Sequence, residues 1–198
     1  RVPQHELNVR AQIHWAGLSW TFGVNNLFNY NYTQLERNLG DIRNFAIVGH
    51  GASGKTILSE SMLSNGGEIN RIGSIEGGST ISDYHHDEHD RQISIHSSPL
   101  HLEWMNTKFN LIDTPGYLDF IGESISSLAV VDLAVVVVHA VNGIEVGTEQ
   151  VWNYANNYDL PKIIVVNGLD REHTKFDEII QQAKDHFGGN VFPMQLPV

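Results

Sequence analysis

One short stretch constrains the fold of this chain more than any other: Gly49-His50-Gly51-Ala52-Ser53-Gly54-Lys55-Thr56. It fits the pattern Gly-x-x-x-x-Gly-Lys-Thr/Ser, in which glycines let the backbone turn its N–H groups inward around a phosphate. The lysine places a positive charge against the β- and γ-phosphates of a nucleotide, and the threonine hydroxyl can ligate Mg²⁺. The alternative is a plain glycine turn between a strand and a helix.

The flanking sequence favours phosphate binding over the plain turn. Residues 44–48, Asn-Phe-Ala-Ile-Val, predict a short buried strand immediately before the loop. Residues 56–63 predict a helix whose N-terminus faces the anion. A strand, a glycine-rich loop and a helix in this order are the context that a phosphate-binding loop requires.

Strands and helices alternate through the rest of residues 41–198. Further strands are expected at 93–102, 109–112, 133–138, 163–166 and 191–194, and helices at 118–128, 145–158 and 176–187. The first two of these strands are expected to form an antiparallel hairpin, and residues 133–138 are too short a run to cross a membrane, which needs ~20 residues. The pattern predicts an α/β P-loop fold with a mostly parallel sheet, helices on both faces, and ligands at the carboxyl ends of the strands.

Two further motifs follow predicted strands. Asp113-Thr114-Pro115-Gly116 begins at a strand end, where Asp113 can hold the Mg²⁺ shell and the Gly116 N–H can meet a γ-phosphate. Asn167-Gly168-Leu169-Asp170 follows the strand at 163–166. A carboxylate at Asp170 can accept hydrogen bonds from guanine N1–H and N2–H₂, which adenine does not offer.

These three motifs, together with the run Gly-Ile-Glu-Val-Gly-Thr-Glu-Gln at residues 143–150, resemble the GTPase domain of translation elongation factor G over residues 42–198. The similarity is greater to the divergent factor-G-like paralogues than to the main factor. The resemblance implies a cytoplasmic GTPase that binds GTP and GDP with Mg²⁺, hydrolyses GTP, and works on the ribosome.

Four positions depart from that family's pattern. Ala52 stands where most translational GTPases have an aspartate, and Ser94 stands where the Mg²⁺-sensing threonine is usual. Tyr117 replaces the histidine that orients the attacking water, and Gly168 replaces a lysine beside the base. The resemblance thus assigns the catalytic roles to Tyr117, Gly116 and Lys55, and the metal to Thr56, Ser94 and Asp113, with slow or impaired hydrolysis expected.

The resemblance also implies that the domain is incomplete at its C-terminus, because the family's Ser-Ala loop, which contacts guanine, has no counterpart before Val198. The absence of cysteine excludes disulfides and thiolate metal sites. A net charge of −11 argues against DNA binding through a basic surface. A P-loop protein that binds a nucleotide without hydrolysing it remains the competing function.

Residues 1–40 form a separate segment in this interpretation, of uncertain origin. Apolar residues alternate with polar ones from Leu7 to Trp15, a strand pattern, and a second strand is expected after the turn at residues 16–17. This hairpin-like alternation and the run Gly-Val-Asn-Asn-Leu-Phe-Asn at residues 23–29 resemble the last strands of TonB-dependent outer-membrane receptors. The alternatives are an amphipathic hairpin against the main domain and a chimeric fragment.

A histidine-rich stretch lies between the first two motifs. Residues 84–90 read Tyr-His-His-Asp-Glu-His-Asp, and on a helix His85 and His89 share one face and could hold a metal. A solvated acidic helix accounts for the same residues equally well.

Since every motif lies beyond Gly40, removal of residues 1–40 is expected to leave nucleotide affinity within about threefold of the parent. Titration of a fluorescent guanine nucleotide into both forms measures this. A loss of about tenfold, which corresponds to ~1.4 kcal/mol, would show that the segment is part of the folded domain.

Overall fold

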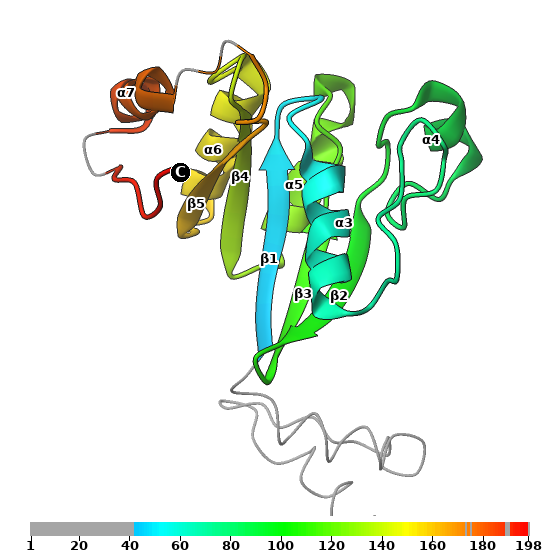
Figure 1. Cartoon of the computed structure of the whole chain (residues 1–198). Helices are drawn as coiled ribbons and strands as arrows, with labels where there is room; N and C mark the ends of the chain where they lie inside the picture. The colour runs from blue at the N-terminus through cyan, green and yellow to red at the C-terminus, as the bar shows by residue number, and fades with distance from the viewer. Residues whose placement is uncertain (1–41, 173, 175, 189–190, 198) are drawn as a thin grey trace, which may run out of the picture. The chain divides into compact units, whose positions relative to one another are not determined.

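A five-stranded sheet forms the centre of the protein in the computed structural model, which describes residues 42–172, 174, 176–188 and 191–197 (Figure 1). The strand order is β2-β3-β1-β4-β5. Strand β4 pairs in parallel with both β1 and β5, whereas β2 and β3 form an antiparallel hairpin. The strands are β1 (Ile42–Gly49), β2 (Ser98–Trp104), β3 (Thr107–Asp113), β4 (Leu133–His139) and β5 (Lys162–Asn167).

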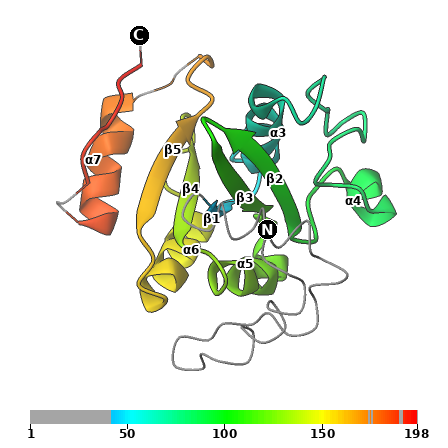
Figure 2. The same cartoon turned by 90° about the horizontal axis from the view of Figure 1, so that it is seen from below.

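Helices cover both faces of this sheet. Helix α3 lies on one face, and α5 and α6 lie on the other (Figures 1 and 2). Helix α7 packs beside α6, where the rings of Trp152 and Phe187 stack with their centroids 4.0 Å apart. The helices are α3 (Lys55–Gly66), α4 (His86–Arg91), α5 (Ile121–Leu128), α6 (Val146–Asn157) and α7 (Phe176–Phe187), with the 3-10 helix η2 (Leu118–Phe120) leading into α5. The predicted α/β architecture is confirmed.

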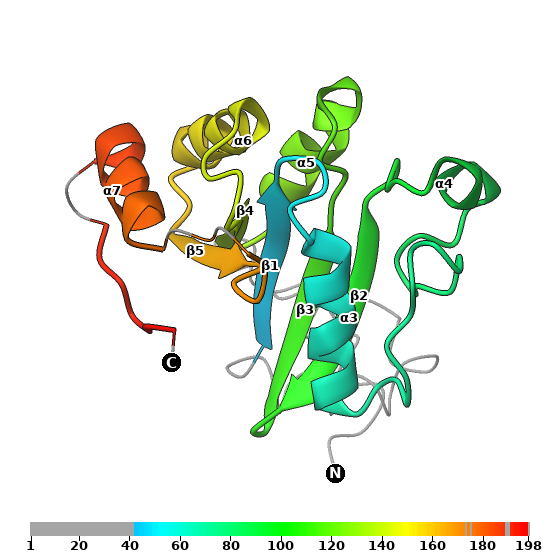
Figure 3. The same cartoon turned by 45° about the horizontal axis from the view of Figure 1, so that its top comes forward.

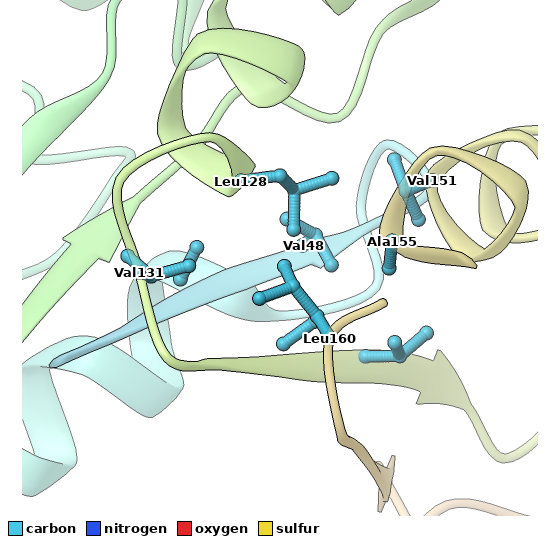
Figure 4. Close-up of a cluster of buried hydrophobic side chains, with 9 residues drawn as sticks. Val48, Leu128, Val131, Val151, Ala155 and Leu160 are labelled. Carbon is cyan, nitrogen blue, oxygen red and sulfur yellow. The ribbon is translucent and has the colours of Figure 1, made fainter. Parts of the chain in front are cut away.

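The alternation of side chains along β1 divides the core into two layers. Phe45 and Ile47 face α3, in a cluster that includes Leu63 and Leu111. Ala46 and Val48 point the other way, into a cluster that joins residues of α5 and α6 (Figure 4). A strand buried on both faces has to be apolar throughout, and residues 45–48 of β1 and 134–138 of β4 are all buried.

The predicted turn between β2 and β3 is confirmed, and its backbone is unusual. Met105 and Asn106 have φ values of 48° and 62°. Two consecutive residues with positive φ are the signature of a type I′ turn, whose twist suits a two-residue hairpin. Asparagine tolerates this region, whereas methionine carries a steric cost there.

The predicted strand at 93–102 begins too early: β2 starts only at Ser98. The amides of Ile95 and His96 donate to the carboxylate of Glu88, at 2.9 and 3.0 Å, and the Ser97 amide donates to Glu123 at 2.9 Å. The carboxylates of Glu88 and Glu123 therefore accept hydrogen bonds from backbone N–H groups that would otherwise donate to a neighbouring strand.

The strand predicted at 191–194 is wrong. The described residues 191–197 contain no strand, and Phe192 and Met194 are exposed. The Val191 amide donates to the Gly188 carbonyl in a turn instead of to the edge strand β5. Apolar composition alone therefore does not make a strand, which also requires pairing with a neighbouring strand.

The predicted hairpin in residues 1–40 lies outside the described residues, so it stays a prediction, as does the division of the chain at residues 40 and 41. From Arg43 onward the described residues form one compact unit. Among the helices of the described part, none is long and apolar enough to cross a membrane.

Met105→Asn should stabilise the protein, because asparagine adopts positive φ at a lower steric cost than methionine. We expect the free energy of unfolding in urea to rise by about 0.5–1 kcal/mol. Met194→Asn, at an equally exposed position with an ordinary φ, is the control. Equal effects of the two substitutions would show that the turn carries no strain.

Candidate functional site

The three motifs meet at the carboxyl edge of the sheet, where β1 runs into the loop that precedes α3 (Figure 3). Gly49, Asp113 and Asn167 are the last residues of β1, β3 and β5. The register of the parallel strands aligns these ends, because Gly49 is opposite Val137 in β4 and His139 of β4 is opposite Asn167.

The glycines of the loop are required by its close contacts. Gly49 has φ of 148°, and a Cβ there would collide with the carbonyl oxygen of Val137. Gly54 has φ of 95° and lies against the side chain of Asn167, which donates from Nδ2 to the Ser53 carbonyl at 3.1 Å. Asn167 therefore stabilises the loop directly, a contact that sequence reasoning had not assigned to it.

Lys55 is buried at the first position of α3. Its Nζ donates to the carbonyl oxygens of Gly49, at 3.2 Å, and His50, at 2.8 Å. Burial lowers the pKa of Lys55 to about 8, while the negative charges of Asp113 and Asp83 act in the opposite direction. At neutral pH the ammonium is thus mostly charged, held within the loop by carbonyl groups that a phosphate could replace.

Asp113 is 2% exposed, and neither of its carboxylate oxygens has a hydrogen-bond partner among the described residues. Burial raises the pKa of Asp113 to about 6, while the Lys55 ammonium and the nearby hydroxyls of Ser82 and Thr56, which lie outside ordinary hydrogen-bond geometry, act in the opposite direction. Burial of a carboxylate without hydrogen-bond partners destabilises the folded protein unless a cation or a hydrogen-bond donor binds it.

The two hydroxyls predicted to ligate the metal lie together. Thr56 Oγ1 and Ser94 Oγ are 3.2 Å apart, although 38 residues separate them in the sequence. A carboxylate and two hydroxyls offer oxygen ligands only, which is the donor set that Mg²⁺ prefers. Thr56, Ser94 and Asp113 therefore fit a magnesium ion.

Gly116 and Tyr117 lie against the loop on the same side. A Cβ on Gly116 would collide with Lys55 Nζ and with the backbone of His50 and Gly51. The Tyr117 ring is 3.3 Å from the position that a Cβ on Gly51 would take, and 44% of the residue is exposed. The second motif therefore reaches the phosphate loop, and Tyr117 keeps access to solvent.

The departures at Ala52 and Gly168 both involve positive φ. Ala52 has φ of 58°, a region that aspartate or asparagine tolerates better than alanine. Gly168 has φ of 77°, and a Cβ there would lie 3.1 Å from His139 Nε2, so a lysine could not simply be restored. Asp170, two residues further on, is exposed.

Two buried acids near the site, Glu60 and Asp83, were missed by sequence reasoning. Glu60 of α3 is 1% exposed and accepts the amides of Gly73, at 2.7 Å, and Ile81, at 2.5 Å. Asp83 lies close enough to Lys55 to support its charge, and burial raises the pKa of Asp83 itself. Glu60 follows Thr56 by one helical turn, so its place on the buried face could have been predicted; its distant backbone partners could not.

Glu145 connects the loop to the start of α6. Its carboxylate lies 3.5 Å from His50 Nε2, and Gly147 is close enough that a Cβ would meet the same imidazole. This contact gives a structural role to the run at residues 143–150, for which the sequence indicated only a family resemblance. His50 of the phosphate loop is therefore positioned by the helix that follows β4.

Comparison with known proteins agrees with this geometry. The family described as the elongation factor Tu GTP binding domain matches residues 40–196. The chain therefore belongs to this family of translation-factor GTPase domains, and the resemblance to elongation factor G is confirmed. The matched residues leave out all of residues 1–38, whose likeness to outer-membrane receptor strands gains no support.

Individual relatives also support membership of this family. Elongation factor G of Mycoplasma pneumoniae is 39% identical over 161 residues, which cover 81% of this chain and 23% of that protein. Mitochondrial ribosome-releasing factor 2 of Candida dubliniensis is 41% identical over 155 residues, 78% of this chain and 19% of that protein. A crystal structure from Thermus thermophilus matches with a TM-score of 0.76 and 34% identity, over 79% of this chain and 24% of that one. The chain thus spans about a quarter or less of the length of these relatives.

Replacement of Asp113 by asparagine should stabilise the isolated protein. The raised pKa means that ionised Asp113 opposes folding above pH ~6, and that this penalty disappears as the pH falls toward the unfolded-state value of ~4. Since Lys55 loses its opposite charge in the variant, we expect a net gain of roughly 1–2 kcal/mol in the free energy of unfolding at pH 8.

Urea unfolding of the Asp113→Asn variant between pH 4 and pH 8, without nucleotide or Mg²⁺, measures this gain. The exposed Asp119→Asn is the control and should change stability by less than about 0.5 kcal/mol at any of these pH values. A destabilised Asp113→Asn at pH 8 would mean that Lys55 and the hydroxyls of Ser82 and Thr56 stabilise the ionised carboxylate by more than its burial costs.

Proposed function

We propose that this chain binds GTP with Mg²⁺ at the carboxyl edge of its sheet and hydrolyses it to GDP and phosphate. The observation that carries the proposal is the buried Asp113 carboxylate, which lacks partners next to a buried Lys55 and a pair of hydroxyls. Such a group of charges and hydroxyls is completed by a triphosphate and its metal ion.

For each part of the nucleotide, the chain offers a group that could bind it. Gly49, His50, Gly51, Ala52, Ser53 and Gly54 supply the loop backbone, and Lys55 carries the charge for the β- and γ-phosphates. The ion, held by Thr56 with Ser94 and Asp113 around it, would neutralise charge that develops on the phosphate oxygens. Asn167 holds the loop, and the exposed Asp170 is free to accept hydrogen bonds from guanine.

Hydrolysis also needs a positioned water and a donor to the γ-phosphate. The Gly116 N–H is the proposed donor, and the Tyr117 hydroxyl is the proposed group that orients the water, since its ring lies against Gly51. A phenol hydroxyl can orient a water by hydrogen bonding, but it is a poorer general base than an imidazole. Positioning by Tyr117 is therefore expected to be weaker than positioning by a histidine.

The biological setting of the reaction is proposed from the relatives. Two of them are named elongation factor G and mitochondrial ribosome-releasing factor 2, so the ribosome is the proposed partner of the intact protein. The proposed location, the cytoplasm, follows from the resemblance to elongation factor G. The competing function, nucleotide binding without hydrolysis, gains no support from the relatives and rests on the tyrosine at position 117 alone.

Substitutions of Tyr117 distinguish GTP hydrolysis from nucleotide binding without hydrolysis. We expect single-turnover GTP hydrolysis by the parent at below about one turnover per minute, and a slower rate for Tyr117→Phe with unchanged GTP affinity, because only the hydroxyl is lost. Tyr117→His should raise the rate, most clearly in a full-length protein with ribosomes present. If the three rates agree within error, Tyr117 is structural and another group positions the water.

Base selectivity tests the role of Asp170 independently of hydrolysis. A hydrogen bond to a charged group contributes roughly 1.5–3 kcal/mol, so Asp170→Asn should shift preference from GTP toward XTP by about ten- to a hundredfold. Competition binding of the two nucleotides measures the ratio. Asp177→Asn, an acidic residue in the first turn of α7, is the control. The same preference in parent and Asp170→Asn would exclude the third motif from base recognition.

A further inference from the structure

Three metal-ligating side chains meet beside α4, outside the nucleotide site. They are His85, Asp87 and His96, and one potential ligand atom of each lies within 4.8 Å of the other two. His96 Nε2 is 3.5 Å from Asp87 Oδ2, and the imidazole rings of His85 and His96 have centroids 4.5 Å apart. The cluster joins the beginning of α4 to the segment that leads into β2.

A buried acid holds the backbone of both histidines. Glu88 is 1% exposed, and one of its oxygens accepts the His96 amide at 3.0 Å and the Ile95 amide at 2.9 Å. Its other oxygen accepts the His85 amide at 3.2 Å. A single carboxylate thus fixes the two backbone positions from which the imidazoles project. This preorganisation distinguishes the cluster from a chance group of surface side chains.

We propose that His85, Asp87 and His96 bind a Zn²⁺ ion. Two imidazoles and one carboxylate are a ligand set that suits zinc, whereas Mg²⁺ and Ca²⁺ favour sites made of oxygen ligands alone. Zinc bonds of ~2.0–2.2 Å in a tetrahedral site separate ligand atoms by a little over 3 Å, so the His96–Asp87 spacing already fits. Small rotations of exposed side chains bring the third ligand into range, and water takes the fourth position.

The site differs from the pairing that sequence spacing suggested. A helix that presented both His85 and His89 is not what forms: His85 is the residue before α4, and His89 Nε2 contacts the Asp83 carbonyl at 2.6 Å. The histidine that completes the cluster, His96, lies outside the helix. Only the fold, which closes the loop through Glu88, reveals this partner.

An ion here would cross-link residues 85 and 96, and Ser94 lies between them. The hydroxyl of Ser94 is the one that touches Thr56 at the phosphate loop. Zinc would therefore hold the segment that carries a proposed magnesium ligand, without using any atom of the nucleotide site. Binding of zinc itself does not depend on the proposed GTPase function.

Calorimetric titration of Zn²⁺ into the full chain, without nucleotide, tests the proposal. His96→Ala and Asp87→Asn should each weaken the strongest site by at least about tenfold. His86→Ala, which removes an exposed histidine of α4 outside the cluster, should change it less than about twofold. Histidines elsewhere in the chain, such as His5 and His14, could also bind zinc. The quantity compared is therefore the zinc affinity of each variant and not the total number of bound ions.

Circular dichroism shows whether each variant is folded, and His96→Gln replaces His96→Ala if the latter is not. An affinity in the parent weaker than about 0.1 mM, or an equal affinity in the parent, His96→Ala and Asp87→Asn, would overturn the proposal. So would an equal loss in His86→Ala and His96→Ala, which would indicate adventitious binding by surface histidines.

Discussion

The opposite charges of Lys55 and Asp113, buried at one edge of the sheet, are the interaction on which the site depends. Burial opposes both charges, lowering the pKa of the lysine to about 8 and raising that of the aspartate to about 6. Their mutual attraction offsets only part of this cost. The apolar layers around β1 and β4 and the glycines that let the loop close are what hold the two groups there. Burial of these two charges therefore lowers the stability of the free protein, and a bound nucleotide and metal ion would offset this cost.

Much of this arrangement could be predicted from sequence because it depends on local chemistry. Gly49 and Gly54 mark backbone that other residues cannot adopt, and the apolar runs of β1 and β4 mark strands covered on both faces. Asp113 and Asn167 end strands, so the general rule for parallel sheets brings them to one edge. The pairing of Thr56 with Ser94 came from the family resemblance, and the 3.2 Å contact between the hydroxyls agrees with it.

The remainder depends on contacts between distant side chains and backbone, which leave no periodic signal. Glu60 and Glu88 look like ordinary helical acids in the sequence, yet their buried carboxylates bind loop amides up to 21 residues away. For the same reason the start of β2 was misjudged, since Glu88 takes the amides of Ile95 and His96. The pairing of His85 with His89 that the helical spacing allowed does not form, because His89 contacts a carbonyl and His96 lies beside His85.

Titration of the Asp113 side-chain carboxyl by carbon NMR, with and without nucleotide, tests the central claim most directly. The account predicts an apparent pKa of about 6 in the free protein. Addition of Mg²⁺ and GDP or a non-hydrolysable GTP analogue should lower it below about 4, because the ion stabilises the ionised form. An ordinary value near ~4 in the free protein, or a raised value that Mg²⁺ and nucleotide leave unchanged, would contradict it.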